Sequence, residues 1–245
     1  MKSVTYTNGK VVPWAKRTKS DIVFIDAGAR EGELFHYPDC CEANKGSFFK
    51  HDEKKLEVRE DLGSHVDYSY MPFPFSIDRS DFTGAEIHLF EPNSDFWERL
   101  NLVAEKISHV AASVTLHQSA VWNENTKKSL LLTDGGWGSS LCPDKINENF
   151  NGSEVTVDCI DFAEFIKSLD SKEVHIKMDI EGAEYDVVPS LFQHEIFLQK
   201  VHSLSVEFHR DFFPEKDQYF WYMYTHFIIA LTKTNRHINW WPGEW

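Results

Sequence analysis

The sequence lacks a long hydrophobic run. One of its longest uninterrupted apolar stretches, residues 227–231, is far shorter than a membrane-spanning helix or the apolar core of a secretory signal. Internal repeats and low-complexity tracts are also missing. We therefore expect a cytoplasmic protein that has no membrane partner.

Positive charge is scarce as well. The 25 Lys and Arg residues stand against 39 Asp and Glu residues, which gives a net charge of −14. A chain of this charge repels phosphate backbones, and its densest basic run is the short stretch 16–19. This balance argues against nucleic acid as a partner.

Two kinds of short motif are incomplete. The four cysteines, at positions 40, 41, 142 and 159, form no Cys-x-x-Cys pair and no Cys/His spacing typical of zinc, so we assign them no function. The sequence contains no Gly-x-Gly-x-x-Gly and no Gly-Lys-Ser/Thr after a glycine turn. Their absence disfavours dinucleotide-binding and P-loop proteins.

The pattern of apolar residues predicts an α/β fold. With 245 residues, of which 42% are hydrophobic, the chain fits one domain over 1–245. Predicted strands alternate with helices in several places, which is typical of a mainly parallel, doubly wound sheet flanked by helices on both faces. The expected strands are 22–26, 86–90, 113–120, 155–159, 174–179 and 203–208, and the expected helices are 96–107, 162–169 and 185–192.

Two regions exceed what such a sheet needs. Residues 33–85 are too long for one connecting helix and are rich in histidine and aromatic residues. We interpret them as an insertion that forms a lid, with His36 and Tyr70 as candidate contacts to an acceptor. Residues 211–245 are expected to form an aromatic helix and a tryptophan-rich tail, which either packs on the core or lines an interface.

The most informative stretch is 176–188, where a buried strand runs into four carboxylates within eight positions, those of Asp179, Glu181, Glu184 and Asp186. One interpretation is that these acids only cap the following helix and favour its positive end. The other is that they face a ligand, because ligands of open α/β sheets bind outside the carboxyl ends of the strands.

Two other strands end in polar turns. After the first, Gly28 and Gly32 would let a ligand approach the backbone and the start of a helix closely. The second ends at Glu91, whose carboxylate either accepts both hydroxyls of a ribose or caps the helix that starts near residue 94. The two strand ends together favour a nucleoside-type ligand.

Six blocks of residues carry a family resemblance. They are Asp26-Ala-Gly-Ala-Arg-Glu-Gly32, Phe90-Glu-Pro-Asn93, Ser119-Ala-Val121, Val157-Asp-Cys-Ile-Asp161, Lys177-Met-Asp-Ile-Glu-Gly-Ala-Glu184 and Val206-Glu-Phe-His209. In this order they resemble the FkbM-type methyltransferases that use S-adenosylmethionine. The resemblance covers residues 20–210 and implies a Rossmann-like class I methyltransferase fold with an insertion after the first strand.

The resemblance also implies a set of cofactor contacts. Asp26 and Gly28 would face the methionine part of S-adenosylmethionine, Glu91 its ribose hydroxyls, and residues 119–121 its adenine edge. Arg30 departs from the family, which often has Asn at that place, and no antiparallel hairpin closes the sheet after the last strand. The full expected set is Asp26, Gly28, Arg30, Gly32, Glu91, Pro92, Asn93, Ser119, Ala120 and Val121.

Methyl transfer to a hydroxyl also needs a group that takes the proton. The expected catalytic residues are Asp179, Glu207 and His209, with His209 either the general base or a surface imidazole paired with an acid. The same three residues are an alternative ligand set for Mg²⁺ or Mn²⁺. Expected substrate contacts are Glu181, His36, Tyr70 and Trp137, the last in a glycine-rich loop that is otherwise a plain turn.

These expectations combine into one function. We expect an S-adenosylmethionine-dependent O-methyltransferase that acts on a hydroxyl of a sugar or glycan. Its alternative acceptor is a small secondary metabolite. Less favoured alternatives are an NAD(P)-dependent oxidoreductase on the same sheet and a cofactor-binding module without catalysis.

Overall fold

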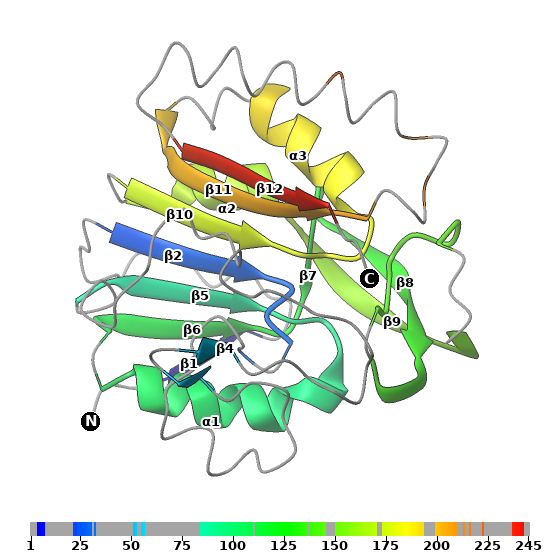
Figure 1. Ribbon diagram of the computed structural model, residues 1–245, viewed down its shortest axis with the longest axis horizontal. Coiled ribbons are helices and arrows are strands. Elements are labelled where there is room, and N and C mark those ends of the chain that lie inside the picture. Colours follow the sequence, from blue (N-terminus) through cyan, green and yellow to red (C-terminus); the bar gives the residue numbers. More distant parts are fainter. Residues whose placement is uncertain are drawn as a thin grey trace.

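The protein is built on a seven-stranded sheet. The computed structural model describes residues 4–7, 22–30, 32, 51–52, 55–56, 84–109, 111–136, 138–145, 150–170, 173–193, 199–209, 213, 216, 222 and 237–242. The order of the sheet is β1-β6-β5-β2-β10-β11-β12, and its six pairings are all parallel (Figure 1). Its strands are β1 (Val4–Thr7), β6 (Ser113–His117), β5 (Glu86–Phe90), β2 (Ile22–Ala27), β10 (Glu173–Met178), β11 (Val201–Phe208) and β12 (His237–Pro242).

Helix α1 (Trp97–Ile107) covers one face of this sheet. It follows a short 3-10 turn, η6 (Ser94–Phe96), in which the side chain of Asn93 accepts a hydrogen bond from the backbone N–H of Asp95. Its apolar side packs on alternate residues of β5 and β6. Alternate residues of a strand point to the same face of the sheet, and that face meets the apolar stripe of the helix. This cluster includes Leu100, Val103, Ala104, Ile107, Ile87, Leu89, Val114 and Leu116.

Helices α2 (Phe162–Ser168) and α3 (Glu184–Gln193) belong to the core on the other face. The side chain of Asp161 caps α2 by accepting a hydrogen bond from the backbone N–H of Glu164. Both helices bury apolar side chains, among them Phe162, Ile166, Val187, Val188 and Leu191, with Val23, Ile25, Ile176 and Leu204 of the central strands. Helices on both faces of a parallel sheet confirm the expected doubly wound α/β fold.

A three-stranded sheet of order β7-β9-β8 adjoins the carboxyl ends of the large sheet, where the arrowheads point in Figure 1. It consists of β7 (Ala120–Trp122), β8 (Thr126–Thr133) and β9 (Phe150–Asp161). β9 pairs antiparallel with β8 and parallel with β7. The loop after β8 starts with the 3-10 turn η7 (Asp134–Gly136) and returns towards the large sheet.

This smaller sheet corrects two sequence predictions. The strand expected at 113–120 is two strands, since β6 ends at His117 in the large sheet and β7 begins at Ala120 in the small one. The strand expected at 155–159 is part of the longer β9, outside the parallel sheet. The pairing partner β8 was missed because its first half is polar and partly exposed, which hides the alternation of a strand.

The edges of the large sheet were also missed. β1 is only four residues long, and β12 lies in the tail where the sequence predicted no strand. β12 pairs in parallel with β11, so a parallel edge strand completes the sheet in place of a hairpin. Most of the segment 33–85 lies outside the described residues, which include there the two-residue strands β3 (His51–Asp52) and β4 (Lys55–Leu56).

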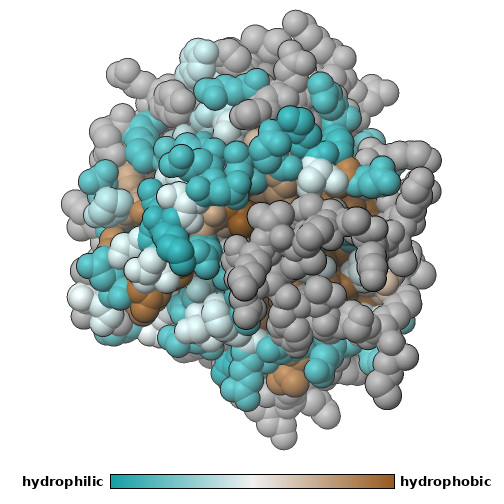
Figure 2. Space-filling model, turned by 180° about the vertical axis from the view of Figure 1, so that it is seen from behind, coloured by the Kyte–Doolittle hydropathy of each residue, from teal (hydrophilic) through white to brown (hydrophobic). Residues whose placement is uncertain are grey.

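The surface of the described part is largely polar. Figure 2 shows hydrophilic residues over much of the back face, with hydrophobic patches between them. The large hydrophobic side chains exposed in this part, Leu102, Val155 and Tyr222, come from separate places in the chain. In the same part of the chain, no helix is both long and apolar enough to cross a membrane.

Candidate active site

The glycine turn after β2 lies directly against the end of β10. Gly28 has a φ of 80°, and a Cβ added there would lie 1.8 Å from the carbonyl oxygen of Asp179. The backbone N–H of Asp179 donates to the carbonyl of Ala27 at 3.0 Å, which continues the pairing of the two strands. Only glycine fits both this dihedral angle and this contact, so the turn and Asp179 form one compact unit.

Lys177 ties this unit together. Its Nζ donates to the carbonyl oxygen of Gly28 at 2.9 Å and lies 3.2 Å from Oδ1 of Asp26. Oδ2 of Asp179 is 3.7 Å from the same ammonium group. Asp26 is 1% exposed, so its charge needs a cation of this kind close by. Sequence reasoning missed this role of Lys177, although the position stands inside the motif that it quoted.

The carboxylate of Glu91 connects the glycine turn to the end of β5. Its Oε2 accepts a hydrogen bond from the backbone N–H of Arg30, and its Oε1 accepts one from that of Asn93, both at 2.8 Å. Arg30 has a φ of 43°, which is uncommon for a residue with a side chain. A carboxylate oxygen can accept more than one hydrogen bond, which is the property that recognition of ligand hydroxyls would use.

Other residues expected at the cofactor surround these strand ends. Pro92 is half-buried and Asn93 is buried, next to Gly136 of the glycine-rich loop, where an added Cβ would lie 2.9 Å from the Asn93 Nδ2. Ser119 is buried between β6 and β7, and Ala120 and Val121 are buried in β7. Gly32 lies against α1, since its Cβ would meet Val103 at 2.8 Å, which gives it a packing role.

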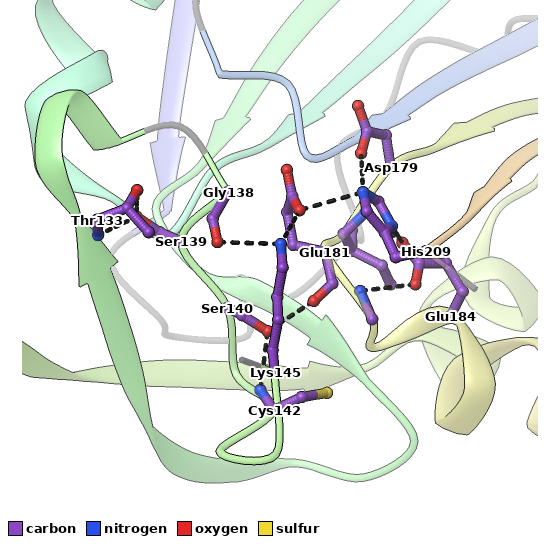
Figure 3. Close-up of polar contacts among 12 residues, drawn as sticks. Thr133, Gly138, Ser139, Ser140, Cys142, Lys145, Asp179, Glu181, Glu184 and His209 are labelled. Atoms are coloured by element: carbon purple, nitrogen blue, oxygen red, sulfur yellow. Dashed lines mark hydrogen bonds and ion pairs between the residues drawn. The ribbon is translucent and has the colours of Figure 1, made fainter. Parts of the chain in front are cut away.

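Asp179, Glu181 and His209 converge at the carboxyl ends of β10 and β11 (Figure 3). Nε2 of His209 lies 3.1 Å from Oε2 of Glu181 and 3.7 Å from Oδ1 of Asp179. The side chains of Asp179 and Glu181 are 30% and 26% exposed, whereas that of His209 is 5% exposed. The two carboxylates therefore face both the buried imidazole and solvent.

Glu184 holds this group from beneath. The side chain is fully buried, and its Oε1 lies 3.2 Å from Nδ1 of His209. The same carboxylate accepts hydrogen bonds from the backbone N–H of Ile180 at 2.8 Å and of Gly182 at 2.7 Å. Among the acids of 176–188, Glu184 is thus the one that shapes the turn, as a helix cap would, while Asp179 and Glu181 face outward.

Lys145, from the loop after β8, completes the cluster. Its Nζ forms an ion pair with Oε2 of Glu181 and donates to the carbonyl oxygen of Gly138 at 3.1 Å (Figure 3). The same loop contacts the backbone of Glu181, whose carbonyl accepts a hydrogen bond from Oγ of Ser140 at 2.6 Å. Sequence reasoning missed Lys145, because no local pattern links it to a residue 36 positions away.

These contacts shift two pKa values. Burial alone would raise the pKa of Glu181, but the adjacent His209 and Lys145 lower it from 4.5 to about 2. Burial opposes a charge on His209, yet Glu184 and Glu181 raise the pKa of the imidazole well above its ordinary value of 6.5. At neutral pH the cluster therefore holds an imidazolium next to the ionised carboxylate of Glu181.

The expected catalytic, substrate-binding and metal-binding residues do not all lie together in the structure. It brings Asp179 and His209 together with Glu181, while the buried Glu207 of β11 lies outside this three-residue group. Trp137, His36 and Tyr70 fall outside the described residues. As a metal site the cluster has suitable donor types, but the ammonium group of Lys145 already occupies the carboxylate of Glu181. The donors present thus do not fit a divalent ion.

Comparisons with known proteins give the family. A model of the Methyltransferase FkbM domain matches residues 41–236. A crystal structure of the methyltransferase FkbM from Methylobacillus flagellatus KT is 15% identical, with a TM-score of 0.35; the match covers 76% of this chain and 33% of that one. No protein with a curated description matches the sequence significantly. Because the domain model spans most of the chain, this protein belongs to the FkbM methyltransferase family.

Proposed function

We propose that this protein is an S-adenosylmethionine-dependent O-methyltransferase that acts on a hydroxyl group of a sugar or glycan. The observation that supports it most is the contact between Gly28 and Asp179. It puts the turn expected to bind the cofactor and the carboxylates expected to bind the acceptor side by side at the sheet centre. Membership of a methyltransferase family supports the same reaction class.

The residues at the strand ends suit the cofactor chemically. Asp26 and Glu91 are two buried carboxylates at the ends of adjacent strands. Asp26 would bind the ammonium group of S-adenosylmethionine, and Glu91 would bind its ribose hydroxyls. Nδ2 of Asn93 is a buried amide donor with no partner among the described residues, so it can donate to a ligand acceptor. S-adenosylmethionine supplies an electrophilic methyl group on its sulfonium.

The acceptor side needs positioning and a proton acceptor. In methyl transfer, the acceptor oxygen forms a bond to the methyl carbon while the carbon–sulfur bond breaks and its electrons return to sulfur. We assign the hydroxyl proton to the carboxylate of Asp179, since His209 is already protonated. Correct placement of the acceptor supplies about 7–11 kcal/mol in such reactions, and a positioned base adds on the order of 10²–10⁴ in rate.

A sugar is the acceptor that the cluster fits best. Asp179 and Glu181 present partly exposed carboxylates next to each other, and each can accept a hydrogen bond from one hydroxyl of a neighbouring pair. The cationic imidazole behind them lowers the pKa of Glu181, so this carboxylate stays ionised. An aliphatic or aromatic acceptor with a single hydroxyl would use only one of these two carboxylates.

The first experiment is titration calorimetry of the purified protein with S-adenosylhomocysteine, S-adenosylmethionine and NAD. Binding of the first two and not of NAD is expected; absence of S-adenosylhomocysteine binding would refute the proposal. Methyl release is then screened against a glycan panel and a panel of small phenols and alcohols. Asp179→Asn should retain S-adenosylhomocysteine binding and lose about 10²–10⁴ in transfer rate, while Glu164→Gln, an exposed acid of α2, should match the native protein.

A further inference from the structure

The ammonium group of Lys145 is almost completely buried. The side chain is 2% exposed, and Nζ contacts the carboxylate of Glu181 and the carbonyl oxygen of Gly138. Burying an ammonium group costs free energy of folding unless an opposite charge compensates it. The neighbouring carboxylate must therefore account for the presence of this lysine. The group that it serves is Glu181, at the opening of the candidate active site.

The donor types next to Lys145 are those that metal centres use. Asp179, Glu181 and His209 each offer one donor atom, and these atoms lie within 4.8 Å of one another. Nδ1 of His209 contacts a second carboxylate, that of Glu184, in the way that an imidazole bound to a metal is usually oriented. The cation that contacts Glu181 in this structure, however, is the ammonium group of Lys145, while that of Lys177 lies 3.7 Å from Oδ2 of Asp179.

We propose that Lys145 is a positioning residue that takes the place of a divalent ion at this centre. Its ammonium group neutralises Glu181 and fixes the carboxylate of Glu181 beside His209. Asp179 and Glu181 are thereby positioned to bind an acceptor without Mg²⁺ or Mn²⁺. The inference builds on the proposed function in one respect, that Glu181 faces the acceptor. The cation itself is part of the chain and needs no loading step.

The loop around Lys145 makes this arrangement rigid. Glu181 has a φ of 59°, a strained angle for a residue with a side chain, and Oγ of Ser140 donates to its carbonyl oxygen at 2.6 Å. The backbone N–H of Cys142 in turn donates to the same Oγ at 3.0 Å. One loop therefore holds Glu181 at both ends, by its backbone through Ser140 and by its carboxylate through Lys145 (Figure 3).

The test uses MnCl₂ alone as the probe and needs no acceptor. Melting temperature and Mn²⁺ binding, followed by calorimetry and by the Mn²⁺ electron spin resonance signal, are measured with and without EDTA. The native protein should show no saturable Mn²⁺ binding and no change in melting temperature. Lys145→Met should melt lower than the native protein in EDTA, bind Mn²⁺ saturably and recover stability in MnCl₂, because the carboxylate of Glu181 then lacks the buried ammonium group. Lys145→Arg and Lys127→Met, a change at an exposed lysine, should behave like the native protein.

Two results would overturn the inference. One is saturable Mn²⁺ binding by the native protein that Asp179→Asn abolishes, which would make the cluster a metal site in spite of Lys145. The other is a folded Lys145→Met variant that gains no Mn²⁺ affinity. If Lys145→Met does not fold, the native protein and its Asp179→Asn variant still decide the question. Failure of the proposed function would appear separately, as absence of S-adenosylhomocysteine binding, on which neither result depends.

Discussion

The imidazole of His209 and the fully buried carboxylate of Glu184 face each other at 3.2 Å, although they come from the end of β11 and the start of α3. This pair fixes one ring nitrogen of His209 and so directs the other towards Asp179 and Glu181. The orientation of the cluster is therefore set by a fully buried residue.

Replacing Glu184 should be costly. Glu184→Gln keeps the shape of the side chain but leaves the cation of His209 without its buried partner, and one of two backbone donors then faces an amide N–H. We expect a loss of about 3–5 kcal/mol in the free energy of unfolding, measured by urea denaturation. Glu164→Gln, at an exposed position, should change that quantity by less than about 0.5 kcal/mol; equal effects for the two variants would contradict this account.

The same cluster predicts how stability depends on pH. Because the pKa of Glu181 falls from 4.5 to about 2 on folding, its contribution is present above pH 4.5 and disappears as the pH drops towards 2. The pKa of His209 is raised, so its contribution is complete below 6.5 and is lost as the pH rises through the higher folded value. Melting temperature should be highest between these limits, and His209→Asn should flatten the alkaline side of the profile.

Comparing Gly28 with Gly84 distinguishes the cost of backbone strain from the cost of steric crowding. Gly28 and Gly84 have φ of 80° and 78°, but an added Cβ would meet the carbonyl of Asp179 at 1.8 Å in the first case and nothing within 4 Å in the second. Gly84→Ala should cost about 1–2 kcal/mol of unfolding free energy through strain alone. Gly28→Ala should cost more than about 4 kcal/mol and weaken S-adenosylhomocysteine binding, as denaturation and calorimetry would show; similar costs would refute the contact.

Glu91 offers a test of the cofactor side. In Glu91→Gln the carboxylate loses its charge, and with it the ability to accept from both backbone N–H groups and from ligand hydroxyls. We expect the dissociation constant of S-adenosylhomocysteine to rise about tenfold or more, measured by calorimetry. Asp95→Asn, an exposed acid in the adjacent turn, is the matched control and should bind as the native protein does.

The central strands were predictable because their signals are local. The apolar runs of β2, β5 and β10 lead into glycine or acidic residues and that of β11 leads into His209, so both the α/β fold and the approximate position of the candidate site follow from sequence alone. The smaller sheet was not predictable in this way. The partly polar sequence of β8 forms a strand because it pairs with β9, and that pairing is a long-range contact which the local sequence does not show.

Side-chain partnerships were harder to foresee than strand ends. Asp179 and Glu181 were expected at the reaction centre, and the structure places them together with His209. Lys145 and Glu184, which fix that group, were not assigned to it, since a lysine in a loop and an acid in the first helical turn have ordinary local explanations. Only long-range contacts distinguish them from surface charges.

The position of β2 at the middle of the sheet also matters while the protein is being made. β2 leaves the ribosome first among the central strands, whereas its neighbour β10 is synthesised much later and His209 later still. Until then one edge of a strand of sequence IVFIDA remains open to other chains. The glycine turn after β2 and the cluster of Asp179, Glu181 and His209 can therefore come together only after β10 and His209 have been synthesised, and until then the open edge of β2 is a site for aggregation.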